Sequence, residues 1–190
     1  MAGVITLIRH GEPALSREVR LNAAEYGDWW SRYESGGLKS RQSPPDDIIA
    51  LASGSAVVVA STRLRAVQSA TILAGDRPFA ADDVFIEAPL PPPPWPRWIR
   101  IGPRHWGFFA RVWWWFFNYH GHEESVAQAH VRADIAARRL IALAADGQDV
   151  LLVAHGFFNT MIGRALKSMG WRRTLGRGYK YWSVRRFEKR

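Results

Sequence analysis

Two short segments of this sequence combine residue types that suit chemistry on a phosphate group. Arg9-His10-Gly11 follows the apolar run 4–8, and His155-Gly156 follows the apolar run 149–154. A third polar segment, Ser61 to Arg65, also follows an apolar run. Arginine forks bind phosphate oxygens bidentately, and a neutral imidazole can attack phosphorus to form a phosphohistidine. Together the three segments predict phosphoryl transfer that requires no metal.

The elements around these segments alternate between short apolar strands and helices. We expect strands at residues 4–8, 56–60, 84–87, 149–154 and 179–187, and helices at residues 46–54, 62–75, 123–145 and 156–169. The stretch 12–45 has no sustained period and is expected to be mostly loop with one short helix. Residues 1–190 therefore predict a single α/β domain, a three-layer sandwich with a mostly parallel central sheet and helices on both faces.

Each polar segment follows one of the predicted strands. Ligands of such sheets bind beyond the carboxyl ends of the strands, so we expect the three segments to meet at that edge. Ser61 and Thr62 are candidate caps for the helix at 62–75. Gly11 and Gly156 would let backbone or ligand approach closely, and the helix that starts at Gly156 offers free N–H groups to an anion.

These motifs resemble those of the histidine phosphatase superfamily, also called the phosphoglycerate mutase-like family. The family has a strand followed by Arg-His-Gly, a Ser followed four residues later by Arg-Ala-x-Gln-Thr-Ala, and an apolar strand that ends in His-Gly. The matching segments of this chain are Arg9-His10-Gly11, Ser61 with Arg65-Ala66-Val67-Gln68-Ser69-Ala70, and Leu151-Leu152-Val153-Ala154-His155-Gly156. Their order and spacing agree with the family over about residues 3–187.

The resemblance implies a role for individual residues. His10 would be the nucleophile that forms the phosphohistidine. Arg65 would bind the phosphoryl group, and Arg63 is the alternative for this role. Positioned cations of this kind stabilise the charge on the transferring oxygens. The phosphate-binding set implied by the resemblance is Arg9, Arg65, His155, Gly11 and Gly156.

The proton donor departs from the family pattern. The family commonly carries its acid in a Leu-x-Glu pattern after the third strand, whereas here Leu90-Pro91-Pro92 places a proline there. The nearest carboxylate is that of Glu87, at the end of the predicted strand 84–87, and we predict it to be the general acid. The reserves are Glu12, Glu123 and Glu124. The segment 121–125 resembles the family's Gly-Glu-Ser and is expected to cap the long helix.

Metal and cofactor chemistry are not indicated. The chain has no cysteine, which excludes disulfides, thiolate metal sites and cysteine nucleophiles. The spacings of the other histidines fit no recognised zinc pattern. We therefore predict no metal and no cofactor. The histidines concerned are His105, His120, His122 and His130.

Prolines and tryptophans gather in a stretch that we interpret as an insert or cap at about residues 89–119. The prolines predict an extended polyproline connection. Six of the ten tryptophans lie between Trp95 and Trp115, and the block 106–119 is apolar around nearly the whole helix. We expect it to be buried, as a cap over the site or in a homodimer interface. Contact with a membrane surface is the alternative, because Trp favours such interfaces and a basic chain attracts acidic lipid.

The charge of the chain favours anionic partners. Its formal net charge is +9 and its pI is about 10.6. Ten Lys or Arg residues face one acid between Arg164 and Arg190, which we interpret as a solvated basic face. No nucleic-acid motif is present, so we expect no nucleic-acid partner. The apolar N-terminal run is too short for a signal peptide and no run is long enough to cross a bilayer, so a cytoplasmic location is expected.

These observations predict a metal-independent phosphatase that hydrolyses a small phosphate monoester through His10. One alternative is phosphoglycerate mutase-type transfer. Hydrolysis is favoured over it because the chain is shorter than typical family mutases and has the proline- and tryptophan-rich stretch where their substrate-shaping residues lie. The other alternative is a catalytically weak binding or scaffold protein of the same fold, which the missing Leu-x-Glu favours.

Overall fold

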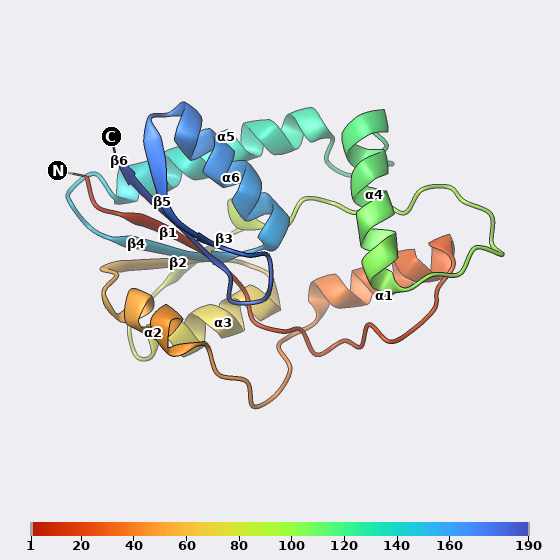
Figure 1. Ribbon diagram of the computed structural model, residues 1–190, viewed down its shortest axis with the longest axis horizontal. Helices are drawn as coiled ribbons and strands as arrows, with labels where there is room; N and C mark the ends of the chain where they lie inside the picture. Colours follow the sequence, from red (N-terminus) through yellow and green to blue (C-terminus); the bar gives the residue numbers. More distant parts are fainter. Residues whose placement is uncertain (1, 190) are drawn as a thin grey trace.

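The computed structural model describes residues 2–189 and shows a six-stranded sheet between two layers of helices (Figure 1). The strands are β1 (Ile5–Arg9), β2 (Val57–Ser61), β3 (Ala80–Asp82), β4 (Val150–Ala154), β5 (Trp171–Arg177) and β6 (Val184–Lys189). The helices are α1 (Ala23–Ser35), α2 (Asp46–Ser53), α3 (Leu64–Ala74), α4 (Pro103–Phe117), α5 (Val126–Leu143) and α6 (Gly156–Ser168), with a short 3-10 helix, η1 (Asp83–Phe85).

The sheet is mostly parallel, as the sequence predicts. Its order is β3-β2-β4-β1-β6-β5, in which β3, β2, β4 and β1 pair in parallel. The last two strands form an antiparallel extension, with β6 against β1 and β5 against β6. The register pairs Arg9 with Ala154 and Ala60 with Val153, so β1, β4 and β2 end at the same edge of the sheet. The residues that follow these ends are therefore brought together.

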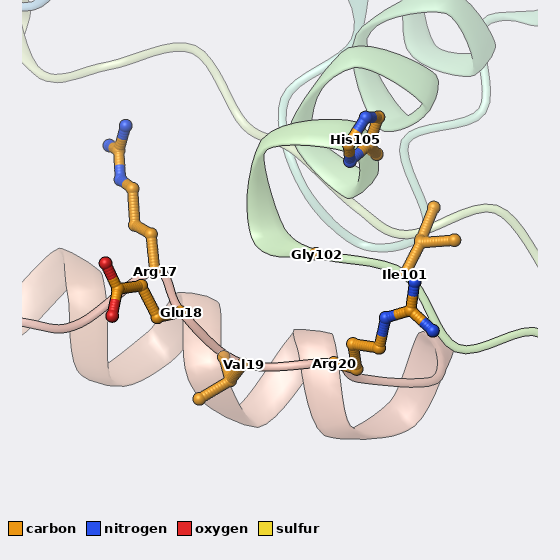
Figure 2. A pocket seen from close by; sticks show the side chains of 7 residues that line it. All are labelled: Arg17, Glu18, Val19, Arg20, Ile101, Gly102 and His105. Atoms are coloured by element: carbon orange, nitrogen blue, oxygen red, sulfur yellow. The ribbon is translucent and has the colours of Figure 1, made fainter.

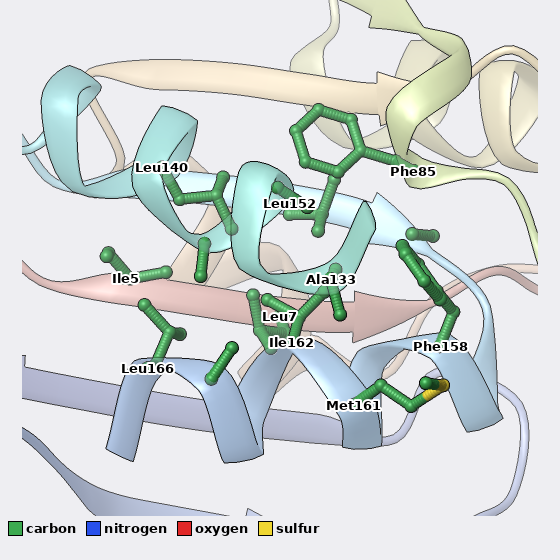
Figure 3. Packing of buried hydrophobic residues seen from close by; sticks show 14 of the residues in the cluster. Ile5, Leu7, Phe85, Ala133, Leu140, Leu152, Phe158, Met161, Ile162 and Leu166 are labelled. Atoms are coloured by element: carbon green, nitrogen blue, oxygen red, sulfur yellow. The ribbon is translucent and has the colours of Figure 1, made fainter. Parts of the chain in front are cut away.

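The two faces of the sheet bury different side chains because successive strand residues point to opposite sides. Leu7 and Leu152 pack against α5 and α6 on one face, where Ile162 and Ala133 fill the interior (Figure 3). Residues one position along the strands point the other way and pack against α2 and α3. The members of that second cluster from the sheet are Ile8, Val58, Ala60, Leu151, Val153 and Val184. This confirms the predicted three-layer sandwich.

Two of the predicted strands are wrong in position. The chain expected to form a strand at 84–87 turns into η1, because the Asp82 side chain accepts a hydrogen bond from the Val84 amide at 2.9 Å and caps it. The strand at this edge is β3, which begins four residues earlier, at Ala80. The strand expected at 179–187 starts only at Val184. The polar strand β5 was missed, since its charged residues show no buried alternation and pairing with β6 holds it in place.

A second, aromatic region lies beside the sandwich, where α1 and α4 pack together (Figure 1). The stretch expected to be mostly loop contains α1, a helix of thirteen residues with a capping box between Asn22 and Glu25. Buried rings from both helices form a separate cluster: Tyr26, Trp29, Tyr33 and Trp106. We call this cluster, with the two helices that carry it, the aromatic lobe. Within the described residues, no helix combines the length and apolarity needed to cross a bilayer.

Candidate active site

The ends of neighbouring strands bring the two motif histidines together. His10 follows β1 and His155 follows β4, and the two ring centroids lie 5.1 Å apart in an edge-on arrangement. Both side chains are buried, with exposed fractions of 2% and 0%. Parallel pairing of β1 with β4 is what makes residues distant in sequence adjacent in space. The structure therefore brings together the two predicted His-Gly segments.

The His10 ring is held in one orientation by its own loop. Its Nδ1 lies 2.7 Å from the Gly11 carbonyl oxygen, which can only accept, so Nδ1 carries the proton and donates. Its Nε2 keeps a lone pair, which accepts from Arg65 Nε at 3.2 Å. Burial, reinforced by the guanidinium groups of Arg65 and Arg9, holds the pKa of His10 well below its ordinary value. The imidazole is therefore neutral at neutral pH, with Nε2 free of a proton.

His155 is held between two hydrogen-bond partners. Its Nε2 lies 2.9 Å from Ser61 Oγ and its Nδ1 lies 3.3 Å from Arg65 Nη2, a group that can only donate. Nδ1 therefore accepts, and Nε2 donates to Ser61. Burial and then Arg65 lower the pKa of His155 well below its ordinary value. The predicted capping role of Ser61 and Thr62 is wrong, because the N-cap of α3 is Arg63 and the Ser61 hydroxyl instead orients His155.

Arg65 is the fully buried cation at the centre of the site. Its Nη2 donates to Glu34 Oε1 at 2.6 Å, and its Nη1 donates to the backbone oxygens of Tyr33 and Glu34. These partners come from the end of α1, so the aromatic lobe fixes the guanidinium against both histidines. Burial of a guanidinium is compatible with a stable fold only when its N–H groups are paired in this way.

Arg9 and Arg63 occupy different positions around this centre. Arg9 Nη1 donates to the backbone oxygen of Tyr179 at 2.5 Å, and the Arg9 guanidinium lies 4.6 Å from the Tyr181 ring centroid. Arg63, the alternative to Arg65, forms an ion pair with Glu34 at 2.9 Å and does not line the cavity that contains His10. Arg65 is therefore the arginine of this segment that reaches the histidines.

These side chains surround a cavity of about 230 Å³, which we call the catalytic cavity. Its lining residues are Arg9, His10, Arg17, Tyr26, Trp29, Trp30, Tyr33, Arg65, Glu87, Leu90, Pro103, Arg104, Gly107 and His155. Four arginines and one carboxylate give it a strongly positive potential that favours an anionic ligand. Arg17 was missed by the sequence reasoning; it donates to Tyr33 Oη at 2.8 Å and lies in a loop without a recognisable pattern.

Glu87 is the one acidic residue among the described residues that line the catalytic cavity. Its carboxylate accepts hydrogen bonds from the amides of Phe157 at 3.3 Å and Phe158 at 2.9 Å, in the first turn of α6. The backbone around it is anchored by Arg132, which donates to the Val84 and Ile86 oxygens. A second anchor, Arg111, donates to the oxygens of the two residues that follow Glu87. The carboxylate thus has a fixed position at the cavity.

The reserve carboxylates lie elsewhere. Glu12 is exposed and pairs with Lys39 at 3.8 Å, and Glu124 pairs with Arg132 at 2.6 Å. Neither of them lines the catalytic cavity, and Glu123 does not line it either. At the predicted cap, Ser125 is the N-cap of α5 and forms a capping box with Gln128.

The two motif glycines are explained by packing against side chains. A Cβ on Gly11 would lie 2.5 Å from Trp182 Cζ2, and one on Gly156 would lie 3.1 Å from Arg9 Cδ. The Gly11 amide donates to Ser69 Oγ at 3.0 Å. Neither glycine is among the residues that line the catalytic cavity. Glycine at these positions therefore allows the strand ends and Arg9 to approach closely.

A further hollow of about 580 Å³ lies beside the catalytic cavity, between the loop 17–20 and the start of α4 (Figure 2). Arg17 lines both spaces, and Gly102 and His105 form the α4 side of the hollow. Across residues 2–189 there is no cluster of three or more His, Asp or Glu side chains placed to hold a metal ion.

Comparison with known proteins agrees with this geometry. The family model of the histidine phosphatase superfamily (branch 1) matches residues 49–189, a span that includes Arg65 and His155 but not His10. No curated protein matches the chain.

Solved structures match over nearly the whole chain. The protein YhfR of Bacillus stearothermophilus is 22% identical with a TM-score of 0.65, covering 98% of this chain and 91% of that one. A phosphoglycerate mutase from Bacillus anthracis is 15% identical with a TM-score of 0.59, covering 99% and 89%. A phosphoserine phosphatase mutant from Entamoeba histolytica, in complex with phosphoserine, is 14% identical with a TM-score of 0.58, covering 87% and 80%. These likenesses show a shared fold.

Proposed function

Because the chain belongs to the histidine phosphatase superfamily, we propose that it hydrolyses phosphate monoesters through a phosphohistidine formed on His10. The observation that carries the proposal is the state of His10. Its Nδ1–H donates to the Gly11 oxygen, its low pKa keeps the ring neutral, and its Nε2 lone pair lies at the catalytic cavity. A neutral imidazole with one oriented lone pair is the form that attacks phosphorus.

In the first step, Nε2 of His10 attacks phosphorus and the bond from phosphorus to the leaving oxygen breaks. Arg65 Nε–H, which donates to His10 Nε2 in the free protein, then donates to a phosphoryl oxygen, and Arg9 holds a second oxygen. His155, whose Nδ1 accepts from Arg65 Nη2, keeps that guanidinium in place. Charge on these oxygens is stabilised by donors that are already in place, which is the main contribution expected of a protein to this reaction. Glu87 gives its proton to the leaving oxygen, so the product is a neutral alcohol.

In the second step, water attacks the phosphohistidine. The carboxylate of Glu87 takes a proton from the attacking water, the nitrogen–phosphorus bond breaks, and inorganic phosphate leaves. His10 returns to its neutral form and Glu87 to its protonated form, which completes the cycle. No metal takes part in this scheme.

Mutase-type transfer is the second candidate. The observation that favours it is the pair of arginines, Arg17 and Arg104, which line the catalytic cavity in addition to the phosphoryl-binding set and offer charge for a substrate carboxylate. Phosphate release measured against 3-phosphoglycerate isomerisation separates the two reactions. The scaffold alternative depended on a missing acid, and the position of Glu87 favours an enzyme instead.

The test is hydrolysis of p-nitrophenyl phosphate by the purified protein and by His10→Ala. We expect turnover in the parent, none in the variant, and an acid-labile phosphoprotein that forms only in the parent. A well-folded parent protein without turnover on a broad panel of phosphate esters would contradict the proposal. Turnover that survives in His10→Ala would contradict the assigned nucleophile.

A further inference from the structure

A larger cleft adjoins the catalytic cavity on the side where the leaving group departs. It has a volume of about 950 Å³ and shares Trp30, Glu87 and Leu90 with the catalytic cavity. In an in-line displacement the leaving oxygen lies opposite the nucleophile. If Glu87 protonates that oxygen, as in the proposed function, the organic group must continue past Glu87. Trp30 and Leu90 are the side chains that it meets there.

One wall of this cleft is apolar and has few hydrogen-bond donors. It consists of the segment 86–92, in which Pro89, Pro91 and Pro92 lack a backbone N–H and have a restricted φ. Leu90 and Trp30 are half-buried at the boundary of the two spaces. Such a wall offers contact area to hydrocarbon and little to sugar hydroxyl groups. The anchors of its first residues, Arg111 and Arg132, hold it in place.

The opposite wall carries charges of both signs. Glu34 lies there and is paired with Arg63 and Arg65, and burial, followed by the charge of Glu34, raises the pKa of Glu123. A volume of about 950 Å³ lies in the range of about 300–1,000 Å³ that is usual for small-molecule sites. A three-carbon phosphorylated acid would leave most of this space unused.

We propose that the substrate is a phosphate monoester of a bulky, largely apolar alcohol, and that Trp30 and Leu90 determine this specificity. The inference rests on the proposed function, since it takes the leaving oxygen to lie beside Glu87. It assigns the proline-rich segment, interpreted from the sequence as a connection within an insert or cap, to substrate binding.

The test compares benzyl phosphate, glycerol 3-phosphate and 3-phosphoglycerate, whose leaving groups are all alkyl alcohols. We expect kcat/KM for benzyl phosphate to exceed that for the other two by about tenfold or more, the effect of filling an apolar pocket. Leu90→Ala and Trp30→Ala should each reduce this preference. Trp98→Ala is the matched control, because Trp98 is 79% exposed and lines neither space.

Equal kcat/KM values for the three esters would overturn the inference, as would a preference that survives in Leu90→Ala and Trp30→Ala. Leu90 lies outside helices and strands, so its variant keeps the test valid if Trp30→Ala does not fold. Neither of these results contradicts the proposed function. Absence of hydrolysis for every ester contradicts the proposed function itself.

An independent observation concerns the outer side of α4, where large aromatic side chains are exposed. Phe108 and Phe116 are 63% and 75% exposed there, and Val112 and Trp115 lie between them. With Phe157 these residues form a shallow apolar depression of about 160 Å³, and we call this surface the outer face of α4. The helix stands at one end of the molecule, away from the central sheet (Figure 1).

The charge at this depression is positive. Two arginines, Arg111 and Arg164, line it, and none of the described residues that line it is acidic. A second copy of the chain would place arginines against arginines, whereas an acidic bilayer offers the complementary charge. We infer that the outer face of α4 docks on acidic membrane surfaces, with its aromatic side chains in the headgroup region.

Cosedimentation with vesicles tests this docking. We expect the protein to bind vesicles of equal parts phosphatidylserine and phosphatidylcholine at low salt, and to bind phosphatidylcholine alone several-fold less. The variant Phe108→Ser with Phe116→Ser should lose binding. The variant Ile49→Ser with Ile72→Ser, two exposed residues of α2 and α3, is the matched control.

Equal binding by the two variants would overturn the docking inference. A second result would also overturn it: the parent forms a dimer in light scattering but does not bind vesicles, and the Phe108 and Phe116 changes disrupt that dimer. That dimer would assign the outer face of α4 to a second copy.

Discussion

The pocket at the ends of β1, β4 and β2, which contains His10, His155 and Arg65, and the aromatic lobe use buried side chains in opposite ways. The pocket buries polar groups: the neutral His10 and His155 and the charged Arg65 are nearly or fully inaccessible, and each is held by hydrogen bonds. The lobe buries aromatic surface, with Tyr26 stacked on Trp29 and on Trp106 at centroid distances of 5.9 and 5.8 Å. The lobe also supplies Glu34 and the carbonyls that pair Arg65. The lobe therefore stabilises the pocket through the polar groups with which it pairs Arg65.

Substitution at the nucleophile should separate the two regions most sharply. We expect His10→Ala to lower kcat by about 10³-fold or more, because no other group at the site replaces the imidazole as nucleophile. Steady-state hydrolysis of p-nitrophenyl phosphate measures the loss, and urea unfolding should show that the aromatic lobe stays folded. Equal losses of activity and of folded protein would mean that His10 acts mainly in packing.

Substitution in the lobe should act on stability instead. We expect Trp106→Ala to lower the free energy of unfolding by about 3–5 kcal/mol, the usual result of removing a buried tryptophan. The Trp106 side chain is fully buried and its Nε1 donates to the Leu21 oxygen at 2.6 Å. Trp98→Ala, at an exposed position, should change stability by less than about 0.5 kcal/mol. Similar effects of the two changes in urea titrations would contradict a packed lobe.

Substitution of the proposed proton donor should lower kcat by less than substitution of His10, and by an amount that depends on the substrate. We expect Glu87→Gln to lower kcat by about 10²-fold for benzyl phosphate, as is usual on removal of a general acid. The loss should be smaller for p-nitrophenyl phosphate, because nitrophenolate leaves without a proton. Parallel kinetics on the two esters check this. A loss of the same size on both would show that Glu87 positions α6 and does not transfer a proton.

The buried histidines should also couple stability to pH. Because the pKa values of His10 and His155 are lowered in the folded state, the unfolded chain takes up protons below about pH 6.5 that the folded protein does not. Stability is therefore present above that pH and lost as the pH falls, by at most about 1.4 kcal/mol per pH unit for each histidine. Urea unfolding at pH 7.5 and 5.5 measures the slope.

His155→Gln should reduce this slope and the exposed His130→Gln is the control. An unchanged slope in His155→Gln would mean that His155 is protonated in the folded protein.

Much of the pocket could be predicted from the sequence because its residues follow strands with strong apolar patterns. β1, β2 and β4 are runs of buried aliphatic side chains, and the polar residues after them had to lie at one sheet edge. The choice of Arg65 instead of Arg63 as the arginine of the site also followed from the motif. The predictions on cytoplasmic location and on the absence of nucleic-acid and metal partners stay predictions.

The aromatic lobe contains a signal that the sequence reasoning missed. Asn22 and Glu25 have the spacing of a capping box, and Tyr26, Trp29 and Tyr33 recur at intervals of three and four. These features indicate a helix within a stretch that was expected to be mostly loop. The many glycines and prolines between residues 12 and 45 obscured it, since they interrupt any longer period.

The sequence by itself determined the sandwich, the two His-Gly segments and the arginine between them, because local apolar patterns and residue chemistry suffice for these. Only the tertiary structure decided which carboxylate lines the catalytic cavity together with His10. Glu87 reaches the catalytic cavity because α6 amides hold its carboxylate and Arg132 holds its backbone, and these partners lie 45 to 71 residues away. Contacts over such separations depend on how the helices pack on the sheet, which no local pattern records.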